Sequence, residues 1–168
     1  MNPVESQIQI RNMTAADVDR VMEIAESLSA APAWPRRAYL DALSSTAAVP
    51  RLALVATTSS APNQGPSEPD SAMLHGFVVA SLLPPRAEIE TFAVAAPMQR
   101  RGVGLLLLAG LTAELKMAGV RELLLEVRAS NQAAISFYRA AGFVPTGRRS
   151  GYYADPEEDA LLMSASLD

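Results

Sequence analysis

The segment Gln99-Arg100-Arg101-Gly102-Val103-Gly104 sets two glycines and two arginines at the start of a predicted helix. The first turn of a helix leaves N–H groups unpaired and carries roughly half a positive charge, so it suits an anion. Gly102 and Gly104 lack a Cβ and let the backbone approach a ligand closely. Neither the P-loop pattern nor the third glycine of a dinucleotide fingerprint is present. Taken alone, the glycines fit a phosphate cradle or ordinary punctuation at a strand-to-helix turn.

A carboxylate and a phenol follow further along the chain. Glu126 lies near the end of an apolar strand, where an unpaired carboxylate is costly to bury. Asn131 and Tyr138 are spaced i, i+7 in the next predicted helix and share a face. If that face meets the end of the strand, a carboxylate, an amide and a phenol converge on one cleft. The residues also allow Glu126 to pair with Arg128 or Arg121, and Tyr138 to be a core aromatic with a satisfied hydroxyl.

The elements that must position these groups are strands with helices interleaved, which indicates an α/β domain. Thr14 and Asp17 form a capping-box pattern, and Gly119 stops the helix that the glycine segment opens. Residues 58–71 are rich in Ser, Pro, Asn, Gln and Gly and predict a flexible loop. We expect strands at 8–10, 51–57, 73–83, 87–95, 120–127, 143–144 and 160–163, and helices at 14–28, 36–43, 103–118 and 130–141, the last capped by Ser130.

Composition narrows the classes of function. The 168 residues are 49% hydrophobic, which suits one domain spanning 1–168. The net charge of −4 argues against a nucleic-acid partner. Cysteine is absent and His75 is the single histidine, so we expect no metal site, disulfide or cysteine nucleophile. No signal peptide and no apolar run of about 20 residues is visible, so we expect a cytoplasmic protein with no membrane partner.

The residues from Ala87 to Met163 resemble the GCN5-related N-acetyltransferases (GNAT). Residues 99–104 match the Gln/Arg-x-x-Gly-x-Gly/Ala pyrophosphate loop of that family. Residues 125–131 (LEVRASN) and 137–143 (FYRAAGF) match the second half of its signature. With 151–153 (GYY) and 158–163 (EDALLM), the chain is most similar to the ribosomal-protein-alanine N-acetyltransferases of the RimI type.

The resemblance implies a mixed, mostly antiparallel sheet of about six to seven strands with about four helices, splayed into a V between the two central strands. It implies direct transfer of acetyl from acetyl-CoA to the N-terminal amine of a protein, with Glu126 as general base acting through a water and Tyr138 as general acid. The cofactor-binding residues that it implies are Phe92, Ala93, Val94, Gln99, Arg100, Arg101, Gly102, Val103, Gly104, Leu105 and Asn131. The substrate-binding residues that it implies are Trp34, Glu88, Tyr152 and Tyr153.

Three points stay open on the acceptor side. Glu88 matches a position that orders the catalytic water in some N-terminal acetyltransferases, but it also fits a substrate-ammonium contact or a solvated charge. Glu90 departs from the family, which more often places an apolar residue there, and Trp34 also fits a helix-packing anchor. A lysine, polyamine or other small amine is an alternative acceptor, and a non-catalytic acyl-CoA-binding module is an alternative class. We expect a monomer or a weak homodimer.

Overall fold

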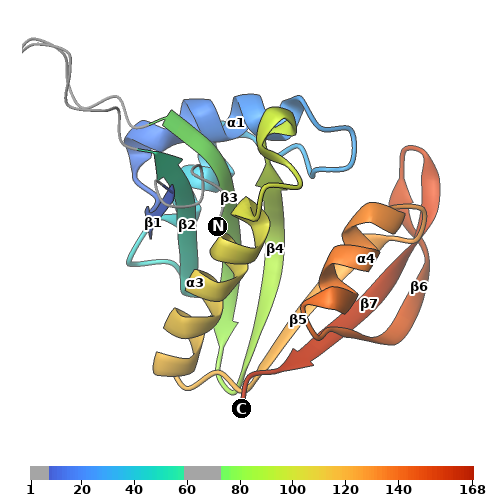
Figure 1. Ribbon diagram of the computed structural model, residues 1–168. Coiled ribbons are helices and arrows are strands. Elements are labelled where there is room, and N and C mark those ends of the chain that lie inside the picture. Colours follow the sequence, from blue (N-terminus) through green and yellow to red (C-terminus); the bar gives the residue numbers. More distant parts are fainter. Residues whose placement is uncertain (1–7, 59–72) are drawn as a thin grey trace, which may run out of the picture.

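One seven-stranded sheet organises residues 8–58 and 73–168, which are the residues that the computed structural model describes (Figure 1). Its strand order is β1-β2-β3-β4-β5-β7-β6. β4 and β5 pair in parallel, and the other pairs are antiparallel. The predicted loop at 58–71 lies outside the described residues except for Thr58. The strands are β1 (Ile8–Asn12), β2 (Arg51–Thr58), β3 (Met73–Leu83), β4 (Arg86–Val94), β5 (Glu122–Arg128), β6 (Val144–Ala154) and β7 (Glu157–Ser166).

Helices cover both faces of the sheet and bury two separate apolar clusters. α3 and α4 contribute Leu107, Leu111 and Ile135 to the larger cluster, which we call the α3/α4 cluster. α1 and α2 contribute Ile24 and Tyr39 to the cluster on the opposite face, the α1/α2 cluster. The helices are α1 (Val18–Glu26), α2 (Arg36–Ala42), α3 (Val103–Met117) and α4 (Gln132–Ala140), with 3-10 turns η2 (Ala15–Asp17) and η3 (Ala96–Met98).

The two central strands part midway along their length. β4 and β5 pair only from Arg86–Glu122 to Ile89–Leu125, although β4 runs on to Val94 and β5 to Arg128. Figure 1 shows the two strands meeting at the bottom of the view and diverging upward. The mixed α/β fold with a V-shaped splay, predicted from the family resemblance, is confirmed.

A β-bulge in β4 lies at the point of divergence. Val79 pairs with Thr91 but Ala80 pairs with Ile89, so Glu90 is an extra residue on β4. An extra residue reverses which side chains face each side of the sheet. Phe92 therefore packs against the α3/α4 cluster, as Ile89 does before the bulge. The bulge thus keeps an aromatic side chain pointing toward α4 where β4 has left β5.

Most element boundaries agree with the sequence prediction, but two predictions were wrong. The cap of α4 is Asn131 rather than Ser130, because the Asn131 Oδ1 accepts the Ala134 N–H at 3.1 Å. The last two strands form a long hairpin, β6 and β7, instead of the two short strands expected at 143–144 and 160–163. β6 is exposed along nearly all its length, so its polar residues and glycines carry no alternating pattern to detect.

Asp17 stabilises the start of α1 through hydrogen bonds to its carboxylate. Its carboxylate accepts two hydrogen bonds from Arg11, each of 2.8 Å, and one from the Thr14 N–H at 2.8 Å. The predicted capping pair of Thr14 and Asp17 is therefore confirmed. The hydrogen bond from Arg11 is the main reason why the pKa of Asp17 is lowered.

We expect Asp17→Asn to reduce the free energy of unfolding by about 1–3 kcal/mol, since bonds to charged groups are lost. Because the folded pKa of Asp17 is lowered, its contribution is complete above the unfolded pKa near 3.9 and is lost as the pH falls through the folded value. Urea unfolding at pH 7 and pH 3 measures both effects. The control Asp41→Asn removes an exposed partner 3.7 Å from Arg37 and should cost under about 0.5 kcal/mol. Equal costs for the two variants would contradict the assignment.

Candidate active site

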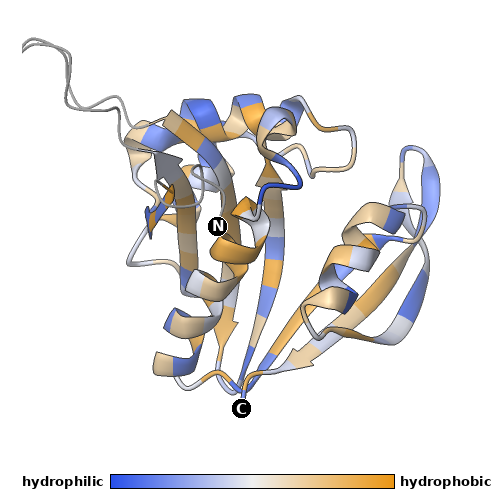
Figure 2. Cartoon of the chain, viewed as in Figure 1, coloured by the Kyte–Doolittle hydropathy of each residue, from blue (hydrophilic) through white to orange (hydrophobic). Residues whose placement is uncertain are grey.

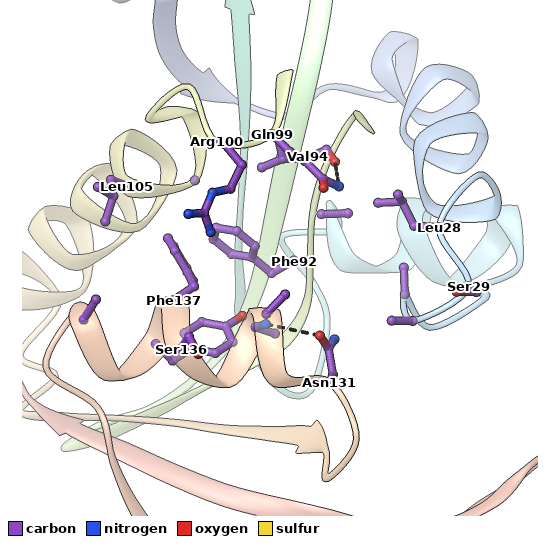
Figure 3. A pocket seen from close by; sticks show the side chains of 18 of the residues that line it. Leu28, Ser29, Phe92, Val94, Gln99, Arg100, Leu105, Asn131, Ser136 and Phe137 are labelled. Carbon is purple, nitrogen blue, oxygen red and sulfur yellow. Dashed lines mark hydrogen bonds between the residues drawn. The ribbon is translucent and has the colours of Figure 1, made fainter. Parts of the chain in front are cut away.

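A cavity of about 850 Å³ opens between the N-terminus of α3, the end of β4 and one side of α4. Figure 3 shows Arg100 and Leu105 on one side, Phe137 and Asn131 along α4, and Leu28 and Ser29 across from them. The last two belong to the connection between α1 and α2, which closes the cavity from the far side. Three segments distant in sequence therefore meet at the open end of the V.

The segment before α3 has the backbone of an anion cradle. Arg100 and Gly102 have positive φ values of 62° and 84°, and successive N–H groups in such a turn form a concave site for an anion. The first helical hydrogen bond runs from the Leu106 N–H to the Gly102 carbonyl at 3.0 Å, so the N–H groups that precede it are available to a ligand. The Gln99 amide donates to the Val94 carbonyl at 3.0 Å and ties the turn to β4. Figure 2 shows a hydrophilic stretch here, between apolar parts of β4 and α3.

Aromatic side chains form the floor of the opening. The rings of Phe92 and Phe137 lie 5.7 Å apart, and Tyr138 packs 5.2 Å from Phe137. Gly104 permits this arrangement, because a Cβ there would lie 3.3 Å from the Phe137 ring. These rings give an apolar passage from the anion cradle to the point where β4 and β5 part.

A second cavity of about 430 Å³ continues from the first on the other side of that point. Tyr138 from α4 lines both cavities, and Glu126 from β5 lines the second. Glu126 alternates with Leu125 and Val127, which are buried in the α3/α4 cluster, so its carboxylate faces the opposite side of the sheet. Burial raises the pKa of Tyr138, so its phenol keeps its proton at neutral pH. The site therefore offers a proton acceptor on one side and a proton donor beside the passage.

Carboxylates from β4 and β5 gather around the second cavity, and arginines balance two of them. Glu90 accepts bonds of 2.6 and 3.1 Å from Arg51, and Glu126 lies 3.0 Å from the Nη1 of Arg149. Partial desolvation raises the pKa of Glu88, and the negative charges of Glu126 and Glu90 raise it further. The mouth of this cavity is thus acidic and suited to a cationic group.

The β6–β7 hairpin closes the second cavity from the side. Arg128 stacks on the Tyr153 ring at 4.1 Å and lies 3.3 Å from Glu158. Glu158 also accepts the Ser130 N–H at 2.6 Å, which links the hairpin to the start of α4. Tyr153 is thereby held as a wall of the cavity.

The structure brings together most of the residues that the sequence singled out. Arg101 and Val103 do not line the first cavity, since Arg101 is exposed and Val103 is buried in the core. Trp34 lines neither cavity and packs 5.3 Å from Tyr39, as a packing anchor would. Glu88 and Tyr152 also line neither cavity, although both lie near Glu126. The predicted residues that line the first cavity are Phe92, Ala93, Val94, Gln99, Arg100, Gly102, Gly104, Leu105, Asn131 and Tyr138. Those that line the second include Glu126, Tyr138 and Tyr153.

Several groups at the site were missed. Arg149 lies on a strand that the sequence did not predict, so no pattern pointed to it. Residues 27–31 are small apart from Leu28 and follow no recognisable motif, yet they line the first cavity. Phe137 could have been found, because it precedes Tyr138 within the FYRAAGF motif.

A family model described as the acetyltransferase (GNAT) family matches residues 55–143, just over half of the chain. The chain belongs to the GNAT acetyltransferase family. The matched range includes the anion cradle, Glu126 and Tyr138, so the predicted membership is confirmed.

Particular GNAT proteins resemble this chain over different lengths. The [ribosomal protein bS18]-alanine N-acetyltransferase of Salmonella typhimurium is 42% identical over 93 residues, which cover 54% of this chain and 63% of that protein. The crystal structure of the ribosomal-protein-S18-alanine N-acetyltransferase from Escherichia coli has a TM-score of 0.73 and 27% identity, covering 96% of this chain and 94% of that one. The crystal structure of Ard1 from Thermoplasma volcanium has a TM-score of 0.77 and 27% sequence identity, and the match covers 95% of this chain and 97% of that one.

Residues 8–58 and 73–168 contain no helix that is both long and apolar enough to cross a membrane. They also contain no cluster of three or more His, Cys, Asp or Glu side chains arranged to hold a metal ion.

The backbone turn predicts a specific sensitivity at Gly102. Gly102→Ala puts a Cβ on a residue with φ of 84°, at a cost of about 1–2 kcal/mol. We expect a lower urea midpoint and up to about tenfold weaker CoA binding by titration calorimetry. The control Gly147→Ala adds a Cβ 3.8 Å from Leu162 and should change neither value. CoA binding by Gly102→Ala at the strength of the wild type would contradict the cradle.

Proposed function

We propose that this chain transfers acetyl from acetyl-CoA directly to the N-terminal α-amine of a protein, with a ribosomal protein as the acceptor. One observation carries the proposal: Glu126 of β5 and Tyr138 of α4 line the same cavity, at the point where β4 and β5 stop pairing. The named activities of the Salmonella and Escherichia coli relatives support the same reaction for this chain.

The first cavity fits acetyl-CoA. Its N–H groups before Leu106, together with Arg100, suit the pyrophosphate, and the Phe92 and Phe137 rings suit the apolar arm. The thioester would then lie near Tyr138, where the two cavities join. Acetyl-CoA supplies the activated acyl group, and the remaining chemistry belongs to side chains of this chain.

The acceptor enters from the acidic second cavity as an ammonium ion. Glu126 removes its proton through a water, and the freed amine attacks the acetyl carbonyl. As the C–S bond of the resulting tetrahedral intermediate breaks, Tyr138 donates its proton to the departing thiolate. The nitrogen then loses its second proton, which restores the Tyr138 phenol, and the proton taken by Glu126 passes to solvent. This chain has no cysteine that could carry the acetyl group, so the transfer is direct.

The ease of deprotonation favours a protein terminus over lysine. A terminal ammonium has a pKa near 7.7–8.0, so about a tenth is free amine at pH 7, against less than about a thousandth for a lysine near 10.4. One carboxylate base is therefore sufficient to deprotonate a terminal ammonium. A ribosomal acceptor would place the reaction in the cytoplasm.

A peptide panel tests the choice of acceptor. We expect acetylation of peptides with a free N-terminus, located at the first residue by fragmentation mass spectrometry. The control peptides have the same sequence with a blocked N-terminus and an internal lysine, and should remain unmodified. Equal acetylation of the blocked peptides would show that the acceptor is a side-chain amine.

The role of Tyr138 has its own test. Tyr138→Phe should reduce kcat by about 100-fold or more, because a general acid contributes about that much. Its affinity for acetyl-CoA, measured by calorimetry, should stay within about twofold, since the ring is kept. The control Tyr39→Phe removes a buried hydroxyl of the α1/α2 cluster that has no hydrogen-bond partner among residues 8–58 and 73–168, and it should leave kcat unchanged. Normal turnover by Tyr138→Phe would exclude the acid role.

A further inference from the structure

Glu126 has a counterion that comes from a different strand. The Nη1 of Arg149 lies 3.0 Å from the Glu126 Oε1. The two groups differ in access to solvent, because 57% of the Arg149 side chain is exposed but only 13% of that of Glu126. The carboxylate is therefore fixed within the site, while the guanidinium approaches it from the surface.

The register of β6 places Arg149 on the face of the sheet that carries this carboxylate, because Arg149 pairs with Ala160, and Ala160 pairs with Arg128, two residues from Glu126. A bulge follows, because Tyr153 pairs with Glu158, so three residues of β6 face one residue of β7. Gly151 at the centre has φ of 60°, and its N–H donates to Asp159 at 2.9 Å. The irregular backbone also brings the Tyr152 hydroxyl to Glu126, and a hydrogen bond to that carboxylate raises the pKa of Tyr152. Residues i and i+3 of a regular strand would point to opposite faces.

The ion pair at Glu126 is weaker than its neighbour at Glu90. Arg51 makes two hydrogen bonds to Glu90, and both side chains are about three-quarters buried, with 27% and 23% exposure. Arg149 has one close N···O contact with Glu126 and is more than half exposed. Bidentate pairs are stronger and more specific in geometry than single contacts. Of the two carboxylates, Glu126 is therefore the one whose counterion can be exchanged.

The groups around Glu126 favour a cation in this position. The charged and titratable side chains that face it are Glu88 from β4, Arg149, Tyr152 and Tyr153 from β6, and Arg128 on β5 itself. Arg128 is engaged by Glu158 and by the Tyr153 ring. Removal of the Arg149 guanidinium would leave Glu88 and Glu126 near one another without a shared positive charge, so another cation would be drawn in.

We propose that Arg149 is the resident counterion of Glu126 and that the terminal ammonium of the acceptor displaces it. The inference rests on the proposed function, and it makes Arg149 a positioning residue that acts through Glu126. Arg149 contacts the carboxylate before the acceptor binds, and it competes with the acceptor for this position. The affinity for the acceptor is thus set partly by a residue of β6.

The test compares Arg149→Met with wild type for a free-N-terminus peptide at pH 7. We expect the KM for the peptide to fall about two- to fivefold, because an ion pair of this exposure contributes up to about that factor. The KM for acetyl-CoA should not change. Arg149→Lys, which keeps a cation, should stay close to wild type. The control Arg86→Met breaks a similar pair, Arg86 with Glu122 at 2.9 Å, across the closed end of the same two strands, and should alter neither KM.

A second readout does not depend on turnover. The chemical shift of the Glu126 carboxyl carbon, followed by NMR in protein labelled with ¹³C at glutamate, reports directly on the groups that contact this carboxylate. Addition of the free peptide to the wild type should shift this signal, and the blocked peptide should not. A Glu126 signal that the free peptide leaves unshifted, or a KM for the peptide that rises or stays constant in Arg149→Met, would overturn the inference. If the wild type acetylates no free N-terminus, the proposed function fails and the displacement fails with it; normal turnover with an unaltered KM overturns the displacement alone.

Discussion

The early end of the pairing between β4 and β5 is the constraint on which the rest of the molecule depends. The two strands share four paired positions and then part, which leaves the last residues of each without a partner on that side. The Glu90 bulge lies at this point and turns Phe92 toward α4. Phe92, Phe137 and Tyr138 then fill the base of the gap with aromatic rings. A regular sheet with the same residues would have no passage between its two faces.

The two faces of the sheet therefore have separate tasks. The α3/α4 face provides N–H groups, a positive helix end and aromatic walls, which suit a long anionic ligand. The opposite face provides carboxylates, of which Glu90 is tied to Arg51 and Glu126 is paired more loosely with Arg149. Tyr138 belongs to both cavities, so it stands where the two ligands would meet. This arrangement would let two substrates approach Tyr138 from opposite sides of the sheet.

The sequence was most informative where one local interaction decides the structure. The Thr14–Asp17 pair and the glycine segment at 102–104 each have a short-range physical cause, and they predicted the starts of two helices. The FYRAAGF motif indicated the cofactor side of the site through its resemblance to the family. The sequence was least informative for β6, where exposure removes the hydrophobic pattern and the register with β7 decides which face Arg149 takes. Trp34 shows the same limit, because an aromatic residue fits a groove or a core equally well until its neighbour Tyr39 is known.

The most direct measurement of the central claim is a crystal structure with a bisubstrate analogue, in which CoA is joined through an acetyl linkage to the N-terminal amine of a peptide. We predict that the pyrophosphate binds to the N–H groups of residues 100–105. The linkage should lie between the separated ends of β4 and β5, beside the Tyr138 hydroxyl. We also predict the peptide on the Glu126 side, with that carboxylate one water away from the amide nitrogen and Arg149 displaced. A peptide leaving on the same face as the CoA moiety, with Glu126 remote from the linkage, would contradict this account.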